Sequence, residues 1–142
     1  MPQPLLPRKS VLAITAVTDI ALHARGRPVA AKALAERQHL PPRHLEPLLQ
    51  NLVRQGILRG VRGPRGGYEL ARDQSCIRAD EILRAASAAQ DGETPLQNGS
   101  GLLRDVVMPA LAQAEDAFAG ALAQINVEDL VRSAETIKVM VD

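Results

Sequence analysis

The chain has 142 residues, 46% hydrophobic and only 1% aromatic, which fits one compact domain with an aliphatic core and excludes a disordered chain. A single cysteine, Cys76, excludes an internal disulfide and a cysteine-rich zinc site, and no apolar run is long enough for a signal peptide or a membrane span. The net charge of +1 hides a division: residues 1–78 hold 13 Lys and Arg against 5 Asp and Glu, whereas residues 79–142 hold 4 against 11. We therefore expect a cytoplasmic protein whose basic first half meets a polyanion.

Three short helices are predicted first. Apolar residues recur at helical spacing over 9–23, an alanine-rich helix covers 30–38, and a third helix covers 42–55. Two prolines mark the tight connection before the third helix, where proline is tolerated because its missing N–H would have no helical partner. One side of the third helix is apolar and carries Leu45, Leu48, Leu49, Leu52 and Val53.

A β-hairpin follows, with strands over 57–61 and 68–71 and a glycine-rich tip between them. The pattern then predicts a short helix over 80–89 and a polar loop over 90–100.

The longest helical pattern covers 101–125, with Pro109 as an early interruption. Apolar residues alternate at spacings of four and three, which is typical of a helix that packs against a second helix. We expect a homodimer, formed through Val107, Leu111, Ala114, Phe118 and Ile125. The rest of the chain reads as a helical piece over 127–134 and a short alternating end at Ile137, Val139 and Val141.

This order of elements predicts a mainly α protein with a small β-hairpin wing: a winged helix-turn-helix followed by a long C-terminal dimerisation helix. The expected divisions are a DNA-binding domain over 8–89, a loop over 90–100, and the dimerisation helix with its tail over 101–142.

Basic and amide side chains outside the apolar sides indicate a partner, which we expect to be double-stranded DNA. Arginine can bond two acceptors of guanine, and glutamine or asparagine can do so on adenine. The third helix offers Arg43, His44, Gln50, Asn51 and Arg54 for base edges. Backbone or minor-groove contacts are expected from Arg8 and Lys9 at the first helix and from Arg59, Arg62 and Arg65 on the wing.

The wing, Val61-Arg62-Gly63-Pro64-Arg65-Gly66-Gly67-Tyr68-Glu69-Leu70-Ala71, together with His44-Leu45-Glu46 and Gly56-Ile57-Leu58, resembles the Rrf2 family of regulators over residues 8 to 90. That family includes an iron–sulfur cluster regulator, a nitric-oxide-sensing repressor and a cysteine-metabolism repressor. The resemblance implies a dimer whose long helices cross, set for a palindromic operator, and we expect a repressor.

The chain departs from the family where many members hold an iron–sulfur cluster on three closely spaced cysteines. The corresponding stretch, residues 90–104, contains no cysteine, and cluster iron needs thiolates. We therefore expect no cluster, no metal and no other cofactor. Cys76 is a candidate redox switch, and the simpler interpretation is a small buried residue.

Two alternatives to DNA binding are a protein–protein interaction module and an enzyme. A winged-helix protein–protein interaction module would use the same basic side chains on an acidic partner, and steep salt dependence with duplex DNA would distinguish the two. No nucleophile–base pair or metal set indicates an enzyme. The effector, the operator and the regulated genes stay open.

Overall fold

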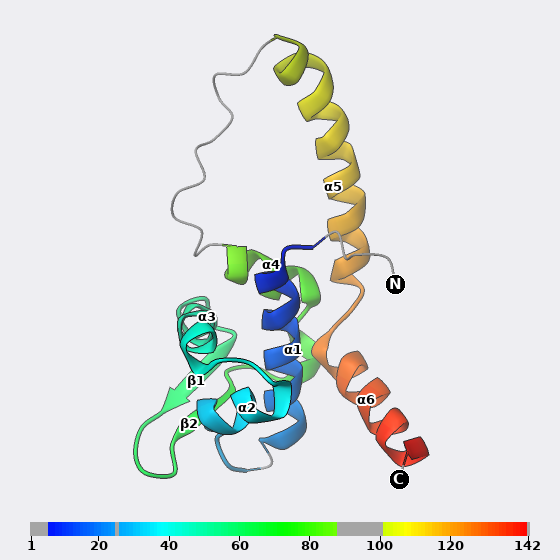
Figure 1. Ribbon diagram of the computed structural model, residues 1–142. Helices are drawn as coiled ribbons and strands as arrows, with labels where there is room; N and C mark the ends of the chain where they lie inside the picture. Colours follow the sequence, from blue (N-terminus) through cyan, green and yellow to red (C-terminus); the bar gives the residue numbers. More distant parts are fainter. Residues whose placement is uncertain (1–5, 25, 88–100, 142) are drawn as a thin grey trace.

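The structure, a computed structural model, describes residues 6–24, 26–87 and 101–141. A helical body carries a two-stranded hairpin, α5 projects from this body, and α6 lies along its side (Figure 1). In chain order the elements are α1 (Arg8–His23), α2 (Ala31–Gln38), α3 (Pro42–Arg54), β1 (Leu58–Val61), β2 (Gly67–Leu70), the 3-10 turn η1 (Gln74–Cys76), α4 (Ala79–Ser87), the π-helical turn η2 (Leu103–Val107), α5 (Met108–Ala123) and α6 (Val127–Val141). The predicted mainly helical fold with one hairpin is confirmed.

The helix α1 is the centre of the body. It contacts α2, α3, α4, α6 and β2, and its inner residues Ala13, Ala16, Val17 and Ile20 are at most 1% exposed. Small side chains at two of these positions let neighbouring helices approach closely. The core around them is aliphatic, and its fully buried members include Leu34, Leu45, Leu49, Leu52, Ile57, Ile77, Ile82 and Val127.

The turn between α2 and α3 is defined by one left-handed residue and two prolines. His39 has φ 55°, which ends α2, and the next N–H, that of Leu40, donates to the Ala35 carbonyl at 2.9 Å. Pro41 is the N-cap of α3 and Pro42 its first residue, so that neither proline removes a helical hydrogen bond. This sharp turn sets the angle at which α3 leaves the body.

A buried carboxylate joins α1 to α2. Asp19 is 3% exposed and accepts hydrogen bonds from Arg37 Nη2 at 2.7 Å and Nε at 3.1 Å, and from Gln38 Nε2 at 2.6 Å. The hydrogen bond to Asp19 is the main cause that raises the pKa of Arg37 above its ordinary value. Because a buried charge is stable only when it is paired and hydrogen-bonded, this contact fixes α2 against α1 directly before the turn to α3.

The wing is held against the body by backbone hydrogen bonds. Beyond the β1–β2 pairing, the N–H of Val29 donates to the Tyr68 carbonyl at 2.8 Å and the N–H of Tyr68 donates to the Val29 carbonyl at 2.8 Å. A Cβ at Gly67 would collide with the Val29 carbonyl, and one at Gly66 would collide with the Val61 carbonyl. The paired glycines are therefore required by close backbone approach on both sides of the hairpin.

The exit of the wing is tied to α4 through Glu81. Its carboxylate accepts from the backbone N–H of Arg78 at 3.0 Å and from Arg72 Nη1 at 3.1 Å. Burial raises the pKa of Glu81, but these two hydrogen bonds and the charges of both arginines lower it overall. The helix predicted over 80–89 is α4, and residues 88–100, with the predicted loop, lie outside the described residues.

The C-terminal segment packs back onto the body. The N–H of Val127 donates to the Ile77 carbonyl and the N–H of Ala79 to the Ile125 carbonyl, both at 2.8 Å, and Val131 lies in the same core as α1. The side chain of Asn126 accepts from the N–H of Asp129 at 2.8 Å, which caps α6.

The alternating end predicted over 137–141 is wrong, because α6 continues as a helix to Val141. Three alternating residues are weak evidence for a strand. Once a helix has been started at its N-cap, each further residue is added at little cost.

The helix α5 projects from the body. Before it, the N–H of Met108 donates to the Leu103 carbonyl, so the interruption predicted at Pro109 is a π-helical turn; such a turn accommodates the missing proline N–H. Leu122 is the only α5 residue that is buried. Among the described helices, none combines the length and apolar character that crossing a membrane requires.

Candidate nucleic-acid interface

The exposed side of α3 carries most of the predicted base-reading residues. Arg43, His44, Gln50 and Arg54 are all exposed, while the opposite side buries Leu45, Leu48, Leu49 and Leu52 in the core. Within the described residues neither Arg43 nor Arg54 forms an ion pair with an acid. Their guanidinium groups are therefore available to an external acceptor.

Asn51 does not belong to this exposed set, which corrects the prediction. The sequence grouped it with the exposed residues of α3, but it is only 8% exposed and lines a groove between α3 and α1. Its position three residues after Leu48 turns it toward α1 rather than outward. The difference arises because helical spacing alone does not say how far a neighbouring helix covers the edge of the apolar side.

The wing carries two kinds of arginine. Arg62 and Arg65 are exposed at the tip and have no ion-pair partner among the described residues. Arg59 lies opposite Glu69 in the hairpin register, and its Nη2 is 2.8 Å from the Glu69 carboxylate. The charge of Arg59 is therefore compensated, which sequence spacing did not predict.

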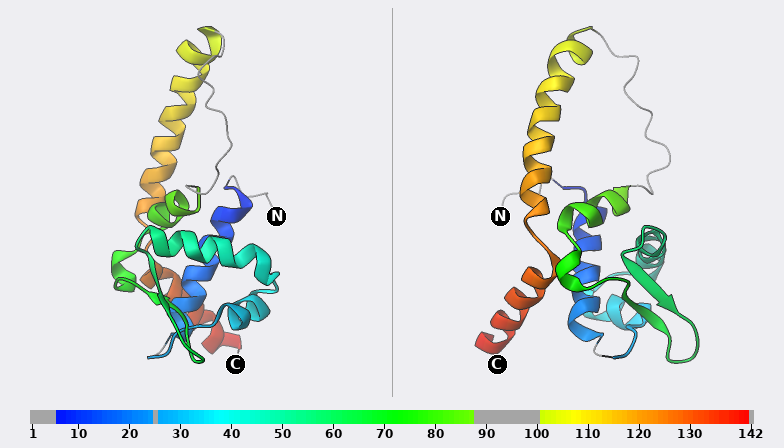
Figure 2. Two further views of the ribbon diagram at one scale, coloured as in Figure 1. Left: turned by 90° about the vertical axis from the view of Figure 1, so that its left-hand side faces the viewer. Right: turned by 180° about the vertical axis from the view of Figure 1, so that it is seen from behind.

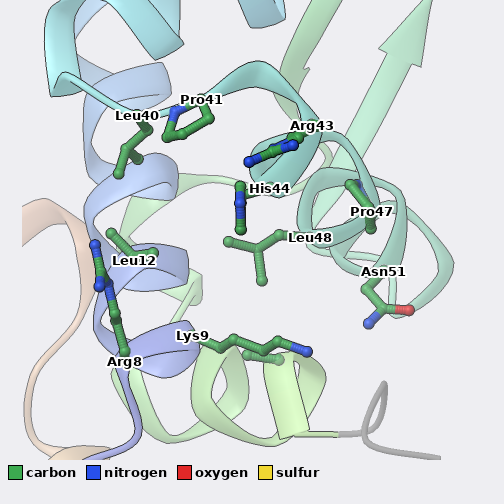
Figure 3. A pocket seen from close by; sticks show the side chains of 11 residues that line it. Arg8, Lys9, Leu12, Leu40, Pro41, Arg43, His44, Pro47, Leu48 and Asn51 are labelled. Carbon is green, nitrogen blue, oxygen red and sulfur yellow. The ribbon is translucent and has the colours of Figure 1, made fainter.

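The first turn of α1 comes near the start of α3. Arg8 and Lys9 are exposed, and together with Arg43 and His44 they line the groove between the two helices (Figure 3). Cations from two segments more than 30 residues apart thus share one surface.

This basic surface and the C-terminal helix α6 lie on different sides of the body. In Figures 1 and 2, α3 and the hairpin occupy one side and α6 the other. The helix α6 holds three acidic and two basic residues, and its place on the other side leaves the attraction of the basic surface for a polyanion undiminished.

The predicted dimerisation residues lie on the projecting helix. Val107, Leu111, Ala114 and Phe118 are all exposed, Leu111 at 54%, whereas Ile125 follows the end of α5 at Ala123 and lies in the connection to α6. Three further exposed apolar residues lie before or at the start of α5, outside the predicted set, although their position before Pro109 was a usable signal: Leu102, Val106 and Met108.

Cys76 is exposed at the end of η1, so the interpretation as a small buried residue is wrong. Its sulfur lies 3.9 Å from the Ser75 hydroxyl. The other thiolates that an iron–sulfur cluster needs are missing from the sequence, which has one cysteine. In the part of the chain that the structure describes, no three His, Cys, Asp or Glu side chains gather into a metal site. The residues present do not fit a cluster.

Comparison with known proteins agrees with this geometry. The Rrf2 family, described as an iron-dependent transcriptional regulator, matches residues 6–133. The chain is 33% identical over 139 residues to the HTH-type transcriptional regulator IscR of Xenorhabdus nematophila, covering 94% of this chain and 83% of the relative. Against IscR of Photorhabdus laumondii the identity is 34%, with the same coverage.

Two solved structures are similar in fold. The structure of T. potens IscR aligns with a TM-score of 0.74 at 28% identity and covers 94% of this chain and 90% of that one. CymR, the global cysteine regulator of B. subtilis, aligns with a TM-score of 0.70 at 23% identity, covering 92% and 98%. The second similarity bears on the fold alone.

Proposed function

The chain belongs to the Rrf2 family and is a DNA-binding transcription regulator, and from this premise we propose that it acts as a homodimeric repressor on a palindromic operator. The observation that carries the proposal is the projecting helix α5, whose large apolar residues other than Leu122 stay exposed in the part of the chain that the structure describes. The DNA partner makes the cytoplasm the proposed place of action.

A second copy is the proposed cover of α5. Large exposed apolar patches mark interaction surfaces, and the spacing of Leu111, Ala114 and Phe118 suits packing of one helix on another. A two-fold axis would bring the same side of α5 from both chains together. It would also relate the two α3 helices, which is why we propose an operator with mirrored half-sites about one helical turn, or a multiple, apart.

In the proposed complex, α3 enters the major groove and the wing follows the DNA backbone. Arg43, His44, Gln50 and Arg54 would reach base edges, because they form the exposed side of a helix that fits the groove. Arg62 and Arg65, with Arg8 and Lys9 at α1, would contact phosphates or the minor groove. Repression would follow if the operator overlaps the site where polymerase binds.

We further propose that this member works without an iron–sulfur cluster. The support is the single cysteine in 142 residues, since a cluster is held by several thiolates or their close substitutes. Protein purified without oxygen should contain no stoichiometric iron or acid-labile sulfide, and a brown protein containing both would refute this part of the proposal.

The experiment for the whole proposal is selection of bound duplexes from a random library, followed by sedimentation of the protein with and without the selected DNA. We expect a mirrored sequence, two chains per duplex, and affinity that falls steeply with salt. Recovery of no preferred sequence, or of one chain on an asymmetric site, would contradict it.

A further inference from the structure

A groove of about 600 Å³ opens between α1 and α3 and is closed at one end by α4 (Figure 3). Sites for small organic ligands have volumes of about 300–1,000 Å³ and combine an apolar lining with a few polar groups. The apolar lining here includes Leu12, Leu40, Leu48 and Ala86.

The groove is also lined by an amide that has no hydrogen-bond partner among the described residues. Asn51 is 8% exposed, and its side chain forms no hydrogen bond with any residue in the described ranges. Although most of the residue is covered, its amide atoms still reach solvent, since they are not among the buried unpaired polar atoms of the described residues. In Figure 3 the Asn51 side chain lies at the edge of the groove, beside Pro47 and Leu48. This amide is therefore available to a polar group of a ligand within the groove.

The charged side chains that line the groove and its mouth are all cationic. Arg8, Lys9 and Arg43 line it, none of them is paired with a carboxylate in the described part of the chain, and no Asp or Glu is among the lining residues. An occupant that suits this surface carries one negative group for the mouth and an apolar body for the lining.

We propose that the groove is an effector site for a small amphiphilic anion. Its carboxylate meets the cations at one side of the groove, Arg8 and Lys9 on α1 or Arg43 on α3 (Figure 3). Its apolar body contacts Leu12 and Leu48, and a polar group of the ligand meets the Asn51 amide. The role as effector rests on the proposed function, because the cations at the mouth are those assigned to DNA. An anion bound there removes them from phosphates and bases.

The coupling has a thermodynamic consequence. If the ligand lowers DNA affinity by some factor, DNA lowers ligand affinity by the same factor. Both sides of this equality can be measured on the same dimer.

The probe for the experiment is 4-phenylbutyrate, with neutral 4-phenylbutyramide as its matched control. The chain has one Phe and one Tyr, so ring-current shifts from the probe are easily recognised in the NMR spectrum of the intact dimer. We expect saturable shifts of the Asn51 side-chain amide and of the backbone at Leu12 and Leu48. The amide control should bind about tenfold more weakly, because it lacks the charge-assisted hydrogen bonds.

Two variants test the location. Leu12→Phe fills the groove and should abolish binding, whereas Leu22→Phe, at a half-buried leucine on the same helix outside the groove, should not. If Leu12→Phe does not fold, the double variant Arg8→Gln, Lys9→Gln decides, since it should bind the acid no better than the amide. Equal binding of acid and amide by the unmodified chain, shifts outside the groove, or absence of saturation would each overturn the site.

A DNA-binding measurement with the probe present distinguishes failure of this inference from failure of the proposed function. Adding the probe should weaken binding of the selected duplex, and unchanged DNA affinity at a saturated groove would overturn the effector role. Failure of the free protein to bind any duplex would instead refute the proposed function and leave the NMR titration to decide whether the site exists.

Discussion

The helices α3 and α5 have similar lengths, 13 and 16 residues, but opposite relations to the rest of the chain. In α3 the apolar residues gather on one side and five residues are buried, while the other side is basic and exposed. In α5 only Leu122 is buried, and large apolar side chains such as Leu111 and Phe118 remain exposed.

The difference shows that one chain can bury the apolar side of one helix and leave that of another exposed. Burial of an amphipathic side is the main source of helix stability in proteins, and α3 obtains it from α1, α4 and β1. Away from its contact with α4, α5 has no comparable neighbour among the described helices and strands. Its stability there depends on helix propensity, which its many alanines favour. We infer that α3 is organised by folding and α5 by association.

The largest effect is expected from breaking the association. Replacing both Leu111 and Phe118 by Glu should convert the dimer to a monomer. A buried side chain of this kind contributes about 1.5–3 kcal/mol, and four are affected per dimer, so the dimer should be weaker by about 6 kcal/mol or more. Sedimentation equilibrium measures the change. The far-UV circular dichroism of the body should remain, and a dimer that persists at low concentration would show that α5 is not the interface.

A smaller effect separates folding from association. In that monomeric variant, unfolding is no longer coupled to dissociation. There Leu49→Ala on α3 should lower the free energy of unfolding by about 2–5 kcal/mol, since the side chain is 0% exposed. Leu102→Ala, at a position 67% exposed, should change it by less than about 0.5 kcal/mol. Urea denaturation provides both values, and equal losses would contradict the distinction between the two helices.

How well the sequence predicted the fold also depends on whether an element's contacts are local or distant. Where apolar spacing was satisfied locally, as in α1, α3 and the hairpin, the sequence predicted the element and its position. It did not predict the Val29–Tyr68 bridge or the docking of Val127 against Ile77. These contacts join distant segments through backbone hydrogen bonds, which almost any residue type can form.

The candidate site was predicted less completely. Exposed arginines on α3 and the wing tip were identified from their residue type and spacing. The burial of Asn51 depends on the covering helix α1, and the neutralisation of Arg59 depends on its register opposite Glu69, so neither could be derived from one segment alone.

A third change affects the exposed side of α3 without its core. Arg43→Ala should leave the unfolding free energy unchanged and cost about 1–3 kcal/mol of base discrimination at one position of each half-site. Binding to a panel of single-base operator variants measures this. Lys32→Ala, which removes an exposed cation from α2, is the control and should leave the preference intact. Uniform weakening on every operator would show that Arg43 contacts the backbone and not a base.

The smallest effect concerns the wing, where a matched comparison is available in one hairpin. Arg65→Ala should reduce the slope of log affinity against log salt concentration by about one unit, the contribution of one phosphate contact. The double variant Arg59→Ala, Glu69→Gln removes an arginine and its carboxylate partner together, so the charge of the wing does not change. Because the Arg59 guanidinium is already bonded to Glu69 at 2.8 Å, this variant should keep the original slope. If the double variant loses as much slope as Arg65→Ala, the ion pair must open on DNA, and Arg59 would then be a phosphate contact like the arginines at the tip.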